Sequence, residues 1–302
     1  MVGKTKRTPE SRLPPEGGGL RWSVERRLAF IEDRLFWLGE INRGAIVRRF
    51  DVSMSQASGD VARYLAMGPK DVDYDRSAKR YVAGAAFRPI LTKPDAHRFL
   101  GELRLVEAGL LHVDETLAGV LPSFATTPLP ERRIDAFLLR AVLQAIRQNH
   151  SLQVLYQSMS RPDPVQRRIE PHAVAYDGFR WHVRAFDRDA GEFRDFVFGR
   201  LSRVRISDPA VSSGAADVDW TAFVDLVIGP HPGLTEAQAR AISLDYGIEG
   251  QSVAIKVRRA LLFYALKRLG LDQDHNTRPP HVQQIVLLNR EAIAPLIRSP
   301  QT

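Results

Sequence analysis

The chain reads LQVLYQSMS at residues 152–160, QRRIEPHAVAY at 166–176, FRWHVRAF at 179–186 and EFRDFVFGRLSRVRI at 192–206. These runs are rich in Val, Ile and aromatic residues, which favour strands, and turn-forming residues separate them. Asp177-Gly178 predicts a tight hairpin, because both central residues of a type I′ turn need positive φ. The stretch therefore predicts consecutive antiparallel strands.

Alternation along these strands predicts an apolar face and a polar face. The strand at 179–186 places Trp181, Val183 and Ala185 on one face and Arg180, His182 and Arg184 on the other. The strand at 166–176 directs Ile169, Pro171 and Ala173 to the core and Arg168, Glu170 and His172 away from it. Residues 151–206 hold ten Arg and no Lys, and Arg grips phosphate or carboxylate bidentately. The alternative is a solvated face of cross-strand Arg–Asp pairs.

A family resemblance rests on Tyr156, Arg168-x-x-Pro171, Arg180-Trp181-His182-Val183 and Phe198-x-Arg200-Leu201. These motifs resemble a WYL domain, with Trp181-His182-Val183 in place of the namesake Trp-Tyr-Leu. The wider pattern resembles the BrxR- and CapW-like subgroup of WYL-domain transcriptional regulators, which controls phage-defence islands. The resemblance implies an Sm/SH3-like β-barrel that binds a nucleic-acid or nucleotide-like effector.

Length and composition bound the architecture. The 302 residues predict two or three domains, and the absence of Cys excludes disulfides and thiolate metal sites. No run reaches the roughly 18 apolar residues of a membrane span, and no apolar segment follows the basic N-terminus, so we expect a cytoplasmic protein that does not bind a membrane. We expect an α+β fold with a disordered basic tail (1–20), a winged helix-turn-helix (21–88), a helical connector (89–150), the WYL barrel (151–208) and a small α/β C-terminal extension for dimerisation (209–302).

The first domain carries the signature of a winged helix. An amphipathic helix is predicted at 23–40, and two short helices joined at Asp51-Val52 follow it. Ser53 and Gln56 form a capping-box pattern at the start of the second short helix. The segment VDYDRSAKRYV (72–82) predicts a β-hairpin wing. Residues 1–88 hold 17 basic and 11 acidic side chains, against 26 and 24 in the rest, as expected of a domain that meets a polyanion.

Candidate DNA contacts lie at the two helix starts, along the second short helix and on the wing. They are Asn42, Arg43, Ser53, Ser55, Gln56, Ser58, Arg63, Arg76, Lys79 and Arg80. Gln56 is either a helix cap or a base-reading residue, since Gln pairs bidentately with adenine.

Candidate effector contacts are the polar side chains that are expected to converge on one face of the neighbouring strands. They are Tyr156, Ser158, Ser160, Arg168, His172, Arg180, His182, Arg184, Arg194 and Arg200. Arginine forks and hydroxyls suit a phosphate, and Tyr156 can stack on a base. The alternatives are a core position for Tyr156 and structural hydrogen bonds for the two histidines.

The sequence contains no phosphate-binding loop, dinucleotide fingerprint, zinc-protease motif or nucleophile elbow. We therefore expect no enzyme activity, no cofactor and no metal. The main hypothesis is a homodimeric repressor that binds an inverted repeat in double-stranded operator DNA and senses an effector. The alternative is an accessory single-stranded nucleic-acid-binding protein that acts on a partner nuclease or helicase.

Overall fold

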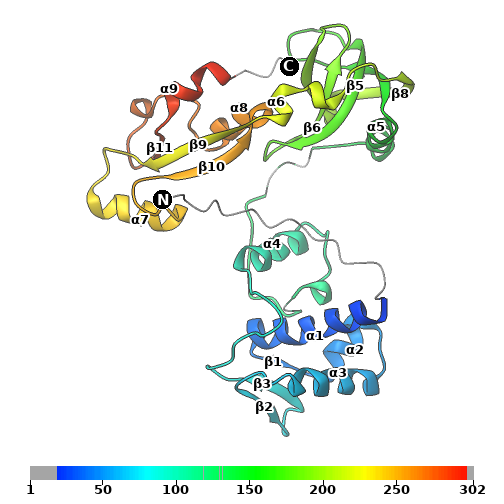
Figure 1. Cartoon of the computed structure of the whole chain (residues 1–302), viewed down its shortest axis with the longest axis vertical. Helices are drawn as coiled ribbons and strands as arrows, with labels where there is room; N and C mark the ends of the chain where they lie inside the picture. The colour runs from blue at the N-terminus through cyan, green and yellow to red at the C-terminus, as the bar shows by residue number, and fades with distance from the viewer. Residues whose placement is uncertain (1–18, 118, 129, 131, 298–302) are drawn as a thin grey trace, which may run out of the picture. The chain divides into compact units, whose positions relative to one another are not determined.

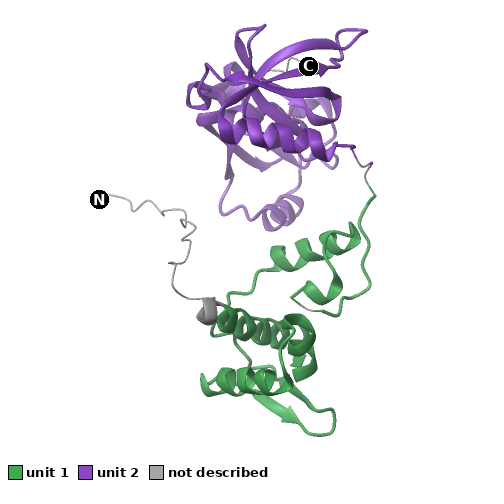
Figure 2. Ribbon diagram, turned by 90° about the vertical axis from the view of Figure 1, so that its right-hand side faces the viewer, with its two compact units in different colours: residues 1–129 green, residues 130–302 purple. Residues whose placement is uncertain are grey.

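The computed structural model describes residues 19–117, 119–128, 130 and 132–297. The expected disordered tail therefore lies almost wholly outside the described residues. The chain forms two compact units, residues 1–129 and residues 130–302, coloured separately in Figure 2.

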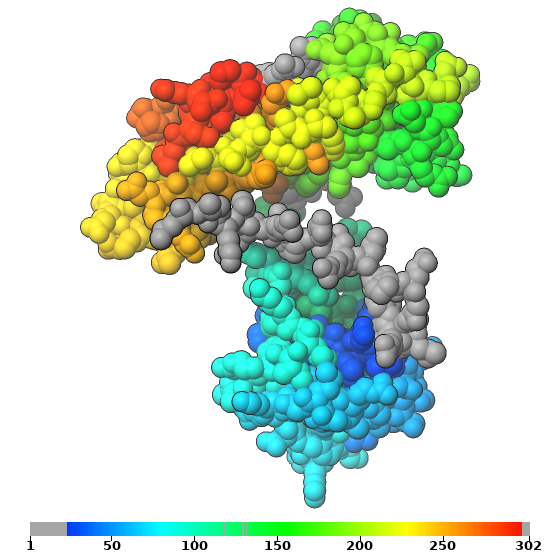
Figure 3. All heavy atoms as spheres, in the orientation of Figure 1, coloured from blue at the N-terminus to red at the C-terminus, as the bar shows by residue number. Residues whose placement is uncertain are grey.

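The first unit is a helix-turn-helix followed by a hairpin (Figure 1). Its elements are α1 (Gly19–Leu38), β1 (Glu40–Ile41), α2 (Arg43–Phe50), α3 (Met54–Ala66), β2 (Val72–Asp75), β3 (Arg80–Ala83), α4 (Ala96–Glu107) and a 3₁₀ turn, Val113–Glu115. Strand β3 lies between β1 and β2 in an antiparallel sheet. The predicted hairpin is present, and β1 is a third strand that the sequence did not suggest. The hairpin tip projects from the rest of the unit in Figure 3.

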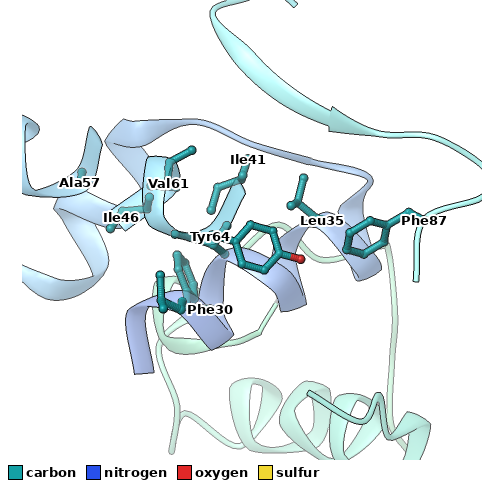
Figure 4. Packing of buried hydrophobic residues seen from close by; sticks show 11 residues of the cluster. Phe30, Leu35, Ile41, Ile46, Ala57, Val61, Tyr64 and Phe87 are labelled. Atoms are coloured by element: carbon teal, nitrogen blue, oxygen red, sulfur yellow. The ribbon is translucent and has the colours of Figure 1, made fainter. Parts of the chain in front are cut away.

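One hydrophobic core joins the three N-terminal helices and the small sheet (Figure 4). From α1 come Ile31 and Leu35, which are one helical turn apart and almost fully buried. From α3 come Ala57, Val61 and Tyr64, which follow the same three- and four-residue spacing. The predicted amphipathic pattern of both helices is therefore confirmed.

The segment 89–150 contributes one helix to each unit. In the first unit, α4 packs on α1 through stacked rings of Trp37 and Phe99, 4.6 Å apart. In the second unit, α5 (Ala136–Gln148) begins where the Asp135 carboxylate accepts a hydrogen bond from Leu138 N–H. Its buried face, with Val142 and Ala145, belongs to the core of the following sheet.

The second unit contains a five-stranded antiparallel sheet in the order β7-β6-β5-β4-β8. The strands are β4 (His150–Tyr156), β5 (Val165–Tyr176), β6 (Trp181–Asp187), β7 (Glu192–Val197) and β8 (Leu201–Pro209). Strands β7 and β8 remain edges, so the sheet is not closed and the expected barrel is not confirmed. The β5–β6 hairpin is present, but only Gly178 of the pair 177–178 has positive φ, so the turn is not type I′.

A smaller antiparallel sheet completes the second unit. It has the order β10-β9-β11, with β9 (Phe223–Pro230) between β10 (Val253–Arg258) and β11 (Ile285–Leu287). The helices α7 (Glu236–Tyr246), α8 (Leu262–Arg268) and α9 (Arg290–Ile293) accompany it, and their apolar residues share one core with the strands. The sequence predicted α7, α8, β10 and β11 but not the central strand β9.

The segment 207–219 has the composition of a linker, but its C-terminal part is packed. A short 3₁₀ turn, Gly214–Ala216, and the helix α6 (Val218–Thr221) follow one another there. We call residues 214–221 the strap. Asp217 in the strap is 1% exposed. A side chain on Gly214 would come within 2.9 Å of His172, so the strap lies directly against β5.

Candidate nucleic-acid interface and ligand pocket

Helix α3 presents small polar side chains outward at its N-terminus. Ser53 accepts a hydrogen bond from Gln56 N–H at 3.1 Å and so caps the helix. Ser55, Gln56 and Arg63 are exposed, and Ser58 is half-buried with its hydroxyl on the Met54 carbonyl. This is the arrangement by which a recognition helix offers its first turns to base edges.

The Gln56 side chain does not complete the capping box. Its amide nitrogen donates to Asp60 Oδ1 at 3.2 Å, and Asp60 is fully buried. Arg27 of α1 pairs with the same carboxylate, with its Nε 2.6 Å from Oδ2. The sequence pattern correctly predicted the Ser53 cap, but the distant partner Arg27 could not be read from local spacing.

Arg43 connects three elements of the winged helix. Its guanidinium reaches Ser58 Oγ at 3.5 Å and Tyr74 OH at 3.4 Å, and it lies 5.8 Å from the centre of the Tyr74 ring. The neighbouring Asn42 caps α2 by accepting from Ala45 N–H at 2.9 Å. Asn42 therefore orders the helix start, and Arg43 ties α2 to α3 and to the wing.

The wing carries the other candidate DNA contacts. Arg76 and Lys79 are exposed at its tip, and Lys79 has a φ of 52°. The Asp75 carboxylate shapes the tip by accepting hydrogen bonds from the Ser77 side chain and from the backbone N–H groups of Ser77 and Ala78. These hydrogen bonds hold the pKa of Asp75 below its usual value. Arg80 is half-buried and pairs with Glu40 at 2.5 Å, so it also braces β3 against β1.

A pocket opens at one end of the five-stranded sheet. It is lined by Tyr156, Ser158, Ser160, Arg161, Arg167, Asp187, Arg194 and Phe196. Four of the predicted effector residues therefore meet here: Tyr156, Ser158, Ser160 and Arg194. The lining residues include three arginines and one carboxylate. Beside the pocket, Glu192 pairs with Arg194 and Asp189 lies 3.9 Å from Arg167.

Asp187 organises the arginines of this pocket. It is fully buried, and its Oδ2 lies 3.6 Å from Arg167 and 3.8 Å from Arg194. Neither contact has hydrogen-bond geometry, so within the described part of the chain this buried oxygen accepts no hydrogen bond. Tyr156 is only 6% exposed and packs edge-on against Phe196, so it belongs to the core and lines the pocket as well.

Sequence reasoning missed Arg167 and Arg161. Along β5, Arg167 shares the parity of Ile169, whose side chain is fully buried, and pairs in register with Val154. The expectation that polar residues point outward favoured Arg168 instead. Arg168 is exposed and lies opposite Gln153, with the other parity, so it does not line the pocket. The signal for Arg167 was present in its two-residue spacing from a core isoleucine.

The predicted convergence of His172, His182 and Arg184 with the pocket is wrong. Strand β5 has a register shift between Pro171 and Ala173, so a β-bulge interrupts the alternation at His172. His182 and Arg184 are buried at 0% and 5% exposure on the opposite face of β6 from Val183. They face the strap and α8 rather than solvent.

Arg184 is the centre of a buried ion-pair network. It donates twice to Asp217 of the strap, at 2.7 and 3.0 Å, and once to Asp195 of β7 at 3.2 Å. His172 lies 3.0 Å from the same Asp217 carboxylate. Burial would raise the pKa of Asp217, but the hydrogen bonds from His172 and Arg184 hold it well below its usual value.

A second network surrounds His182. Its Nε2 lies 2.9 Å from Asp177 Oδ2, and its ring lies 5.0 Å from that of Tyr264 in α8. Burial would raise the pKa of Asp177, but bonds from His182 and from the N–H groups of Phe179 and Arg180 lower it to about 2. The structure thus gives both histidines hydrogen-bonded partners within the fold.

Arg180 and Arg200 line a different hollow from Arg194. It is bordered by Arg132, Arg133, Ile134, Arg180, Trp181, Val197, Gly199 and Arg200. The ten predicted effector residues are therefore divided between the pocket, this hollow, the buried networks and, for Arg168, the exposed face of the sheet.

Two further observations concern the described residues only. No helix among them is both long and apolar enough to span a membrane. In the same part of the chain, no cluster of three or more His, Asp or Glu side chains is suited to hold a metal ion.

Comparison with known proteins adds three family matches in chain order. Residues 23–105 match the winged helix-turn-helix domain of the BrxR transcriptional regulator, residues 138–206 the WYL domain, and residues 223–293 the C-terminal dimerization domain of BrxR.

Three relatives match almost the whole chain, each described as a DNA-binding transcriptional repressor CapW. The Pseudomonas aeruginosa protein is 35% identical over 298 residues, 99% of this chain and 100% of that protein. The Stenotrophomonas maltophilia protein is 36% identical over 285 residues, covering 92% and 94%. The Escherichia coli (strain KTE188) protein is 34% identical over 281 residues, covering 93% and 94%.

A winged helix followed by a WYL sheet and a dimerization domain defines a class, the WYL-domain transcription regulators. Within that class, the chain belongs to the BrxR/CapW family, as its sequence motifs predicted. This is a family of DNA-binding regulators and not of enzymes.

Proposed function

We propose that the protein is a repressor that binds operator DNA as a homodimer. The observation that carries the proposal is the full-length similarity to proteins named as DNA-binding repressors, together with an exposed α3 and wing. In this proposal the operator is an inverted repeat upstream of a phage-defence operon, and repression takes place in the cytoplasm. The C-terminal domain, residues 223–293, holds the two subunits together.

In the proposed complex, α3 lies in the major groove and the wing follows the backbone. Gln56 and Arg63 contact base edges, whereas Arg76 and Lys79 contact phosphates. Arg43 is engaged with Ser58 and Tyr74 and sets the position of the wing relative to α3. Asn42 and Ser53 cap the starts of α2 and α3. The backbone N–H groups of a helix N-terminus favour contact with a phosphate.

We infer that the pocket at the end of the five-stranded sheet binds the effector. Arg161 and Arg167 supply donors for a phosphate, and Ser158 and Ser160 add hydroxyls. The buried Asp187 carboxylate, 3.6 Å from Arg167 and 3.8 Å from Arg194, holds these arginines at the pocket wall. Guanidinium and hydroxyl groups together suit the phosphate of a nucleotide or of a nucleic-acid strand.

Strand β7 provides a route from the pocket to the C-terminal domain. Arg194 lines the pocket, while the next residue, Asp195, points to the other face and bonds Arg184 and Tyr264. Tyr264 belongs to α8 of the C-terminal domain. A ligand that shifts β7 would therefore change the contacts of the dimerisation domain as well.

Operator release tests the sensing part of the proposal. Fluorescence anisotropy would follow a labelled duplex of the upstream intergenic DNA as single-stranded DNA, RNA or nucleotides are added. We expect one of these to change operator affinity for the wild type, and Arg167→Gln to abolish the change. Arg168→Gln is the matched control, because it removes the same charge one residue away on the exposed face.

A wild-type response in Arg167→Gln would contradict the pocket assignment. Preference of the whole protein for single strands over the intergenic duplex would instead favour an accessory protein that acts on a nuclease or helicase. No specific observation favours that second function.

A further inference from the structure

Gln56 is the third residue of α3, and the side chain of a buried residue holds its amide. Its Nε2 lies 3.2 Å from Asp60 Oδ1, one helical turn further along. Asp60 is fully buried, and Arg27 holds its carboxylate with contacts of 2.6 and 3.4 Å. Gln56 itself is exposed.

The chemistry of this contact fixes the direction of the amide. A carboxylate paired with a guanidinium accepts hydrogen bonds, so the Gln56 amide must turn its nitrogen toward Asp60. The amide is planar, and its oxygen then points to the opposite side. Gln56 thus offers an acceptor, Oε1, and retains one N–H that Asp60 does not use.

We propose that Asp60 orients Gln56 to read an exocyclic amino group in the major groove, with adenine as the preferred base. This inference rests on the proposed placement of α3 in the groove. Adenine presents its N6 amino group to Oε1 and its N7 acceptor to the remaining N–H, and cytosine presents only an amino group. Guanine and thymine direct carbonyl oxygens at the same place, where Oε1 repels them.

Asp60 is therefore a positioning residue, and Arg27 holds it in place. Without Asp60 the amide can rotate by half a turn and offer its NH₂ to a guanine or thymine oxygen. The buried ion pair between Arg27 of α1 and Asp60 of α3 therefore determines which base Gln56 recognises.

Base analogues in the operator test the inference with the full chain. Each adenine under α3 is replaced in turn by purine, which lacks the 6-amino group, or by 7-deazaadenine, which lacks N7. We expect one position where purine weakens wild-type binding about tenfold or more, the range of a base-reading pair. Gln56→Ala should bind purine and adenine operators at that position equally well.

The role of Asp60 needs a variant that changes preference rather than affinity. Asp60→Asn keeps the shape but can donate, so the preference for adenine over guanine at that position should fall severalfold. Because this variant can also weaken folding, Gln56→Lys is the second test. Its ammonium pairs with Asp60 and offers only donors, so the preferred base should become guanine.

The outcomes separate this inference from the proposed function. Sequence-specific operator binding that tolerates purine at every adenine under α3 would overturn the inference and leave the repressor function intact. Failure to bind any upstream duplex specifically would instead overturn the proposed function. A folded Asp60→Asn protein, verified by circular dichroism, with wild-type base preference would exclude Asp60 as the positioning residue.

Discussion

Arg63 and Lys79 are exposed cations on two elements of the winged helix, and we expect them to act differently on DNA. Arg63 lies on α3, so Arg63→Ala should relax specificity at one base pair by about 1–3 kcal/mol. Lys79 lies at the wing tip, so Lys79→Ala should weaken all duplexes alike and reduce the salt slope by about one.

Binding titrations at several salt concentrations, on operator and on scrambled DNA, measure both effects. Arg104→Ala on α4 is a control that removes one exposed charge away from α3 and the wing. Wild-type specificity in Arg63→Ala would mean that this residue does not face the bases.

The lowered pKa of Asp177 predicts that the stability of the fold depends on pH. Its pKa is lowered from 3.8 to about 2 in the folded state. A depressed carboxyl pKa stabilises the fold above the unfolded value, and this contribution is lost as the pH falls from about 4 to about 2. Denaturant unfolding between pH 5 and pH 2 should therefore show a smaller loss of stability for Asp177→Asn than for the wild type. Equal pH slopes for the two proteins would contradict the assignment.

At the residue scale, the sequence identified the right kinds of side chain more reliably than their faces. Tyr156, Ser158, Ser160 and Arg194 do line one pocket. Arg167 was missed because a charged residue was expected to avoid the inner face, where the buried Asp187 makes it tolerable. That partner comes from a strand whose pairing becomes known only with the fold.

At the element scale, Arg184 links β6 to the strap through its ion pair with Asp217. Arg184→Ala would leave Asp217 and Asp195 buried without their cation, which costs about 3–5 kcal/mol for a buried pair. The sequence suggested Arg184 as an effector contact, but its burial makes it a residue that stabilises the fold. Urea unfolding followed by tryptophan fluorescence measures the effect.

Two variants frame that measurement. Arg168→Ala removes an exposed arginine from β5 and should change stability by less than about 0.5 kcal/mol. Arg184→Lys keeps the charge but loses the bidentate fork to Asp217, so it should lie between wild type and Arg184→Ala. Equal stability of Arg184→Ala and wild type would show that the network contributes nothing.

Elements with a strong local period were predictable, and those defined by distant contacts were not. The helices α1 and α3 and the wing follow from apolar spacing, a capping serine and a hairpin pattern. The strap looked like a linker because its small residues carry no period, yet Asp217 anchors it to β5 and β6. The bulge at His172 changes which residues share a face, and its position depends on the pairing with β6.

At the scale of the whole molecule, the winged-helix pattern and the WYL-like motifs predicted the first domains, and the family resemblance implied the C-terminal extension. The winged helix, the WYL sheet and the C-terminal domain all match their families in that order. The closed barrel was expected from resemblance alone, and the observed sheet keeps two edges. Closure depends on the pairing of β7 with β8, which local pattern does not encode.

Hydroxyl-radical footprinting of the intergenic DNA upstream of the neighbouring operon tests the central claim, a dimeric operator-binding repressor, most directly. A two-fold dimer predicts two equally protected half-sites in inverted orientation, their centres about one helical turn or a multiple of it apart. Uniform protection without half-sites, or none at concentrations that saturate single-stranded DNA, would contradict the account.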